Sequence, residues 1–189
     1  MARQPLSLKA RAIGLLAQRE HSRLELRRKL LTIERRTRTA AQVAAGGRRS
    51  DDGTPPPDDF DADDTFIDRE AHREDTEAAV DALLDTLAAA GYLNENRFVE
   101  SRVHQRASRF GVQRIQQELS QHGLKLDADQ QEALRASELD RAREVWLKRF
   151  GPEPAREPAE QARQTRFLMA RGFSPELVRR LLRAAPGSD

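Results

Sequence analysis

Three segments of the sequence share one pattern, in which a small corner residue is followed by apolar residues at fixed helical spacing. The corner residues are Ser22, Gly111 and Ser174. Four positions later stand Leu26, Ile115 and Val178, and eight positions later stand Leu30, Leu119 and Leu182. This spacing places the apolar residues of each segment on one face of a helix. A unit this small cannot bury that face alone, so the three copies are expected to stack on their neighbours.

Signals for helix starts and ends recur between the corners. Ser22 with Glu25 has the spacing of a capping box, Asp127 with Gln130 can cap a further helix, and Pro175 follows a corner at the first position of a helix. No segment alternates apolar and polar residues as a strand would. The sequence therefore predicts an all-α fold, an elongated array of three tandem three-helix repeats. We expect the repeats at 1–90, 91–137 and 138–189.

Residues 38–68 interrupt this helical pattern. They contain Gly46-Gly47, three consecutive prolines from Pro55 to Pro57 and a run of aspartates. Dense negative charge and proline cannot build a core, so the sequence predicts a disordered acidic insertion in the first repeat. A solvating linker is the ordinary role of such a segment, and mimicry of nucleic acid is the alternative.

The net charge of +2 is divided unevenly along the chain. Residues 1–49 hold 13 Lys and Arg against three acidic residues, whereas 51–81 hold two Arg against 13 acidic residues. The basic part outside the acidic segment is typical of proteins that bind a polyanion or an acidic protein surface.

Clustered arginines are the candidate binding residues. Arginine suits two-pronged contacts with phosphates or carboxylates, although each cluster alone is equally well explained as a solvated face paired with Glu. The candidate contacts are Arg23, Arg27, Arg28, Lys29, Arg102, Arg106, Arg109, Arg114, Arg179, Arg180 and Arg183.

The sequence lacks the residues that several classes of function require. The chain has no Cys, no phosphate-binding glycine loop and no pair of His at helical spacing among its four His. We therefore expect no catalytic residue, metal or other cofactor, with His21 as a corner-packing residue and Trp146 as a core residue. No apolar run approaches the about 20 residues that a membrane-spanning helix needs, and the N-terminus lacks the apolar core of a signal peptide. These features predict a cytoplasmic protein.

Three motifs resemble those of the RecX family of recombinase regulators. The first runs from Leu15 to Leu30, the second from Gly91 to Phe98 and on through Arg106, Gly111, 115–119 and Gly123, and the third from Phe167 to Ser174. They occur in the order of the family and span most of the chain outside 38–68.

The resemblance implies tandem three-helix repeats and a role as modulator of the RecA recombinase. It implies that the protein lies along the groove of the RecA filament on single-stranded DNA. There it would restrain filament growth and dampen strand exchange, ATP hydrolysis and the co-protease activity of the DNA-damage (SOS) response. It implies no catalytic residues. We expect a monomer that binds RecA, with at most weak non-specific binding to DNA.

A second function belongs to another class. The pair of helices around Ser22 fits a helix-turn-helix transcription regulator that binds DNA directly, with Ser22–Ile33 as its recognition helix. A third alternative is a helical scaffold for some other protein.

Overall fold

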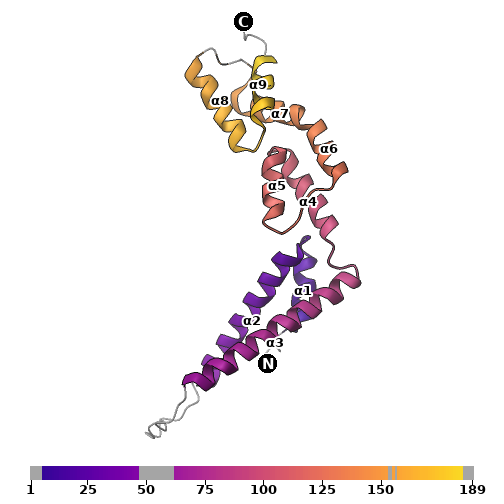
Figure 1. Ribbon diagram of the computed structural model, residues 1–189, viewed down its shortest axis with the longest axis vertical. Coiled ribbons are helices and arrows are strands. Elements are labelled where there is room, and N and C mark those ends of the chain that lie inside the picture. Colours follow the sequence, from indigo (N-terminus) through magenta and orange to yellow (C-terminus); the bar gives the residue numbers. More distant parts are fainter. Residues whose placement is uncertain (1–5, 47–61, 153–154, 156, 185–189) are drawn as a thin grey trace. The chain divides into compact units, whose positions relative to one another are not determined.

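The described residues form helices, most of which follow one another through short connections (Figure 1). The computed structural model describes residues 6–46, 62–152, 155 and 157–184. Their helices are α1 (Leu8–Leu16), α2 (Arg23–Gly46), α3 (Ala62–Ala89), α4 (Glu95–Ala107), α5 (Val112–Ser120), α6 (Ala128–Ala136), α7 (Glu138–Phe150), α8 (Pro158–Ala170) and α9 (Pro175–Ala184). No strand occurs within these ranges, so the all-α prediction is confirmed.

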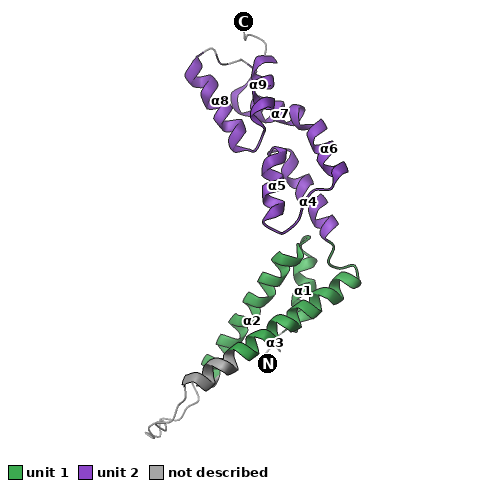
Figure 2. Cartoon of the chain, in the orientation of Figure 1, with its two compact units in different colours: residues 1–94 green, residues 95–189 purple. Residues whose placement is uncertain are grey.

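Two compact units divide the chain at residues 94 and 95 (Figure 2). The first unit holds α1, α2 and α3 around one apolar cluster. The fully buried members of that cluster are Ala12, Leu26, Leu30, Val80 and Leu84. Each helix contributes one apolar stripe, which is how a three-helix unit removes its apolar surface from water.

Helices α2 and α3 reach further into the predicted insertion than the sequence pattern indicates. Residues 38–46 continue α2 and residues 62–68 open α3, so the predicted bounds of 38 and 68 are corrected. The prediction for 47–61 lies outside the described residues. The alanine-rich end of α2 favours helix. A contact with α3 also stabilises the extension of α2, because the Arg38 guanidinium donates a 2.6 Å hydrogen bond to the Thr76 hydroxyl.

The second unit contains two further apolar clusters, one after the other in the sequence. The first is built from α4, α5 and α6 around Phe98, Ile115 and Leu119. The second is built from α7, α8 and α9 around Trp146 and Leu168. Trp146 is a core residue as predicted, and its indole N–H donates to the Gln164 side-chain oxygen at 2.9 Å. The repeat bounds at 1–90, 91–137 and 138–189 remain proposals, and Leu93 of the first cluster lies just beyond the first of them.

The three corners repeat in structure as they do in sequence. Leu26, Ile115 and Val178, four residues beyond the corners, are all fully buried in their own clusters. Ser22 and Ser174 cap their helices, since each hydroxyl accepts a hydrogen bond from the backbone N–H three residues later, at 3.1 and 3.3 Å.

The second corner has glycine because another corner touches it. The Gly111 N–H donates to the Arg171 carbonyl at 2.9 Å. A Cβ on Gly111 would lie 2.2 Å from the Gly172 carbonyl oxygen and 2.5 Å from the Phe173 nitrogen, so no larger residue fits. Gly172 itself has a φ of 81°, and a Cβ there would lie 2.5 Å from that of Arg114. The two three-helix groups of the second unit therefore meet backbone against backbone.

A carboxylate from α7 replaces the missing serine at this corner. Glu138, at the start of α7, accepts a 2.8 Å hydrogen bond from the Val112 N–H in the first turn of α5. Glu138 is only 7% exposed, so this hydrogen bond is made away from solvent. The cap of α5 thus depends on tertiary contact, whereas α2 and α9 are capped by their own chain segments.

Candidate interaction surface

Five of the predicted binding cations are paired with carboxylates. Their ion pairs join Arg23 to Asp85 at 2.7 Å, Arg27 to Asp81 and Glu77 at 2.7 and 3.0 Å, Lys29 to Glu25 at 3.3 Å, and Arg106 and Arg114 to Glu118 at 2.9 and 3.8 Å. A cation held by a carboxylate has less positive potential to offer a ligand. The solvated-face reading, in which Glu or Asp pairs with the arginines, fits these five, and their role as binding contacts stays a prediction.

Arg27 is the most firmly held of them. Its Nε and one Nη donate to both oxygens of Asp81, at 2.7 and 3.0 Å, and the same Nη reaches Glu77 at 3.0 Å. The hydrogen bonds to Asp81 and Glu77 raise the pKa of Arg27. The hydrogen bond between Arg27 and Asp81 also lowers the pKa of Asp81. Arg27 consequently joins α2 to α3, and its role is to hold the first unit together.

The other six predicted cations have no carboxylate within ion-pair distance in the described part of the chain. They are Arg28, Arg102, Arg109, Arg179, Arg180 and Arg183. Arg102 lies over the Phe98 ring, with its guanidinium carbon 5.1 Å from the ring centroid, and Arg109 lies 5.7 Å from the centroid of Phe110. Their charges are free to act on a partner.

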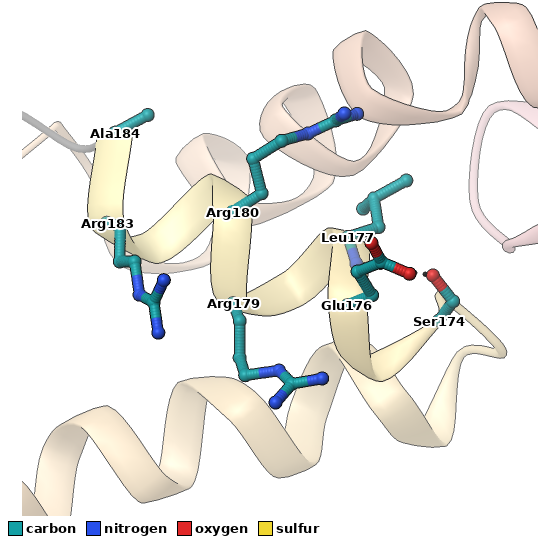
Figure 3. A pocket seen from close by; sticks show the side chains of 7 residues that line it. All are labelled: Ser174, Glu176, Leu177, Arg179, Arg180, Arg183 and Ala184. Atoms are coloured by element: carbon teal, nitrogen blue, oxygen red, sulfur yellow. Dashed lines mark hydrogen bonds between the residues drawn. The ribbon is translucent and has the colours of Figure 1, made fainter.

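Three of these six lie on α9. Arg179, Arg180 and Arg183 are all exposed and line a shallow hollow (Figure 3). In Figure 3 Arg179 and Arg183, one helical turn apart, project on one side of the helix and Arg180 on another. The apolar face of the same helix, with Leu177, is buried in the core. We call this group of three arginines the α9 surface.

A second hollow gathers four cations, three of which the arginine clusters of the sequence did not indicate. It lies where the end of α4 meets α7 and α8, and its lining residues are Ser108, Arg109, Val145, Lys148, Arg149, Phe167 and Arg171. We call this hollow the basic cleft. Of its four cations only Arg109 was predicted as a contact. Arg171 belongs to the third motif and Lys148 and Arg149 end α7, but only the fold brings them together.

The cations of the basic cleft repel one another. Burial is the largest influence that lowers the pKa of Arg171, and the positive charges of Arg109 and Arg149 lower it further. The Arg171 guanidinium carbon lies 3.7 Å from the centroid of the Phe167 ring, which holds it in place by a cation–π contact. Phe167 in turn packs edge-on against Phe150, with centroids 5.0 Å apart.

Buried polar groups elsewhere serve packing. His21 is 1% exposed at the corner before α2, and its Nδ1 lies 3.2 Å from a Glu25 oxygen. Burial is the largest influence on the pKa of His21 and lowers it, so the core disfavours the charged ring, as expected of a corner-packing residue. The described residues contain no cluster of three or more acidic or His side chains fit for a metal ion, and none of their helices has the length and apolar character of a membrane span.

Comparison with known proteins identifies the family. Residues 94–134 match the second three-helix domain of RecX, and 136–182 match the third. The protein named Regulatory protein RecX from Leptothrix cholodnii is 44% identical over 97% of this chain and 92% of its own length. The protein of the same name from Ralstonia nicotianae is 42% identical over 98% of this chain and 92% of its own length. The one from Pseudomonas putida is 36% identical over 94% of this chain and 90% of its own length. The predicted resemblance is thus confirmed, and the chain belongs to the RecX family of regulatory proteins.

Proposed function

We propose that this chain is a non-enzymatic regulator that binds RecA and its filament on single-stranded DNA, mostly inhibiting recombinase, ATPase and co-protease activity. The observation that carries the proposal is the match to proteins named Regulatory protein RecX over nearly the whole chain. The partner comes from the resemblance of the three sequence motifs, which implies RecA as the target.

The distribution of free charge supports binding to a larger assembly. The α9 surface and the basic cleft carry cations without carboxylate partners among the described residues. A filament that contains DNA offers repeated negative charge, and several weak contacts on one chain add up through their high effective concentration.

The same distribution counts against a helix-turn-helix transcription regulator. Its recognition helix would begin after Ser22, where Arg23, Arg27 and Lys29 are all engaged with carboxylates. Only Arg28 on this stretch is exposed and unpaired within the described residues. A helix that reads bases needs several free donors on one face.

The test is the single-stranded-DNA-dependent ATPase activity of RecA with increasing amounts of the full chain. We expect inhibition by the parent. A triple reversal of the α9 surface (Arg179→Glu, Arg180→Glu, Arg183→Glu) is expected to raise the half-inhibiting concentration at least tenfold, since three peripheral charge contacts together are worth about 2 kcal/mol.

The matched control reverses three exposed cations outside both surfaces, Lys125, Arg135 and Arg143, with the same change in net charge. It is expected to inhibit like the parent. No effect of the parent chain on RecA would overturn the proposed function. A folded α9 variant that inhibits as well as the control would remove the α9 surface from the contact.

A further inference from the structure

We propose that the basic cleft is a binding site for the phosphate backbone of a nucleic-acid strand, held by Arg109, Lys148, Arg149 and Arg171. The cleft has a volume of about 550 Å³. It opens to solvent, because Arg109, Lys148 and Arg149 are exposed and Arg171 is half-buried. A phosphate group and the adjoining sugar fit within such a volume, and further nucleotides extend along the surface.

Uncompensated charge is the first argument for an anionic ligand. Among the described residues that line the cleft, four are cations and none is acidic. Among the described residues none of the four has a carboxylate within ion-pair distance, in contrast to Arg106 and Arg114 nearby in the sequence. The mutual repulsion of these cations is relieved when an anion enters.

Preorganisation is the second argument. The Arg171 guanidinium is stacked on Phe167, and the Arg171 carbonyl accepts the hydrogen bond from Gly111. The Arg141 guanidinium of α7 donates to the carbonyls of Ala107 and Phe110 at 2.8 and 2.9 Å, and these hydrogen bonds bracket the backbone of Ser108 and Arg109. The Arg171 side chain and the backbone around Ser108 and Arg109 are therefore held before a ligand arrives, so that less conformational entropy is lost in ordering this part of the cleft.

The density of charge favours nucleic acid over an acidic protein surface. Nucleic acid carries its negative charges at short regular intervals, about 3.4 Å along each strand of a duplex. Several carboxylates at such spacing would repel one another on a protein, whereas the phosphodiester chain fixes its charges covalently. Arginine also binds phosphate oxygens in a two-pronged manner, and the Ser108 hydroxyl adds a neutral donor.

This contact does not require RecA. It concerns the free chain and bare nucleic acid, so its failure leaves the proposed regulation of RecA intact, and the reverse also holds. Contacts with phosphates alone carry no sequence information, so we expect weak binding without sequence preference.

The experiment measures fluorescence anisotropy of a labelled oligothymidylate with the full chain over a range of salt concentrations. The cleft variant is Lys148→Glu with Arg149→Glu, two exposed residues whose replacement leaves the core intact. The matched control is Arg135→Glu with Arg143→Glu, which has the same charge and lies on the same unit. Circular dichroism of each variant checks its fold.

The cleft variant is expected to bind at least tenfold more weakly, while the control loses less than threefold. The slope of log affinity against log salt is expected to fall by about 1.4 in the cleft variant, because each phosphate contact to a single strand contributes about 0.7. A second variant, Arg171→Lys, keeps the charge but loses the stacking. It is expected to bind more weakly with nearly the parental slope.

Three results would overturn the proposal. One is the absence of salt-dependent binding by the parent, and another is an equal loss in the cleft and control variants. The third is displacement of the oligonucleotide by polyglutamate at an equal concentration of charge, which would identify the cleft as a site for acidic protein segments.

Discussion

The contact between the corners at Gly111 and Gly172 predicts a large cost for one added methyl group. In Gly111→Ala the new Cβ would lie 2.2 Å from the Gly172 carbonyl oxygen, 2.4 Å from its carbonyl carbon and 2.5 Å from the Phe173 nitrogen. These are backbone atoms, so the corner before α9 must move by about 1 Å to restore ordinary van der Waals contact. Gly111 has a φ of −75° and a ψ of 169°, which alanine adopts without strain.

The magnitude follows from the contacts that are lost. Overpacking of this kind costs about 1–3 kcal/mol, and loss of the hydrogen bond from Gly111 to Arg171 costs about 1 kcal/mol. Alanine also lowers the conformational entropy of the unfolded chain, which stabilises the fold by up to about 1 kcal/mol. We therefore expect the free energy of unfolding of the second unit to fall by about 1–3 kcal/mol.

Urea denaturation followed by tryptophan fluorescence measures this loss, because Trp146 is the one tryptophan of the chain and lies in the core beside the displaced corner. The control is Gly123→Ala, whose Cβ meets nothing within 4 Å and whose φ of 73° costs alanine about 1 kcal/mol. A loss in Gly111→Ala below about 1 kcal/mol, or below that of the control, would refute the reasoning.

Two further predictions concern the first unit. Burial raises the pKa of Glu25, but the hydrogen bond from Arg19, with its charge and that of neighbouring cations, lowers it to about 2 from 4.5. Since its folded pKa lies below the unfolded one, Glu25 contributes stability above pH 4.5 that is lost towards pH 2. The full shift corresponds to about 3 kcal/mol, which screening by solvent reduces to about 2 kcal/mol. The lowered pKa of His21 adds a loss that begins below pH 6.5. Thermal unfolding of Glu25→Gln against pH should lack the first loss; equal profiles for parent and variant would contradict this assignment. Arg27→Met leaves Asp81 without its partner and is expected to lower the free energy of unfolding by about 1 kcal/mol in urea titrations, against about zero for Arg28→Met. Equal midpoints for these two variants would show that the ion pair does not stabilise the fold.

Helix patterns in the sequence located most elements because their signals are local. The capping box at Asp127 and Gln130 opens α6 as predicted, and the serines at two corners cap their helices. Local signals misplaced the ends of α2 and α3, since the stabilising contacts there, such as that from Arg38 to Thr76, run between helices far apart in the sequence.

For the candidate contacts, the sequence identified the type of residue but not which of these residues have partners. Composition and clustering identified arginines, but a cluster does not reveal which members have partners. Arg27 and Arg28 are neighbours in the sequence, yet one is held by two carboxylates of α3 and the other is exposed. Partner choice is set by which helix lies alongside, and that depends on long-range packing.

The sequence by itself determined the all-α class, the three corners and the RecX family, because periodicity, caps and motifs are written in consecutive residues. Only the tertiary structure decided that glycine at the second corner makes room for Gly172, that Glu138 replaces the missing serine cap, and that Lys148 and Arg149 join Arg109 and Arg171. These features depend on segments between 22 and 62 residues apart in the chain meeting in space, and no local pattern encodes such a meeting.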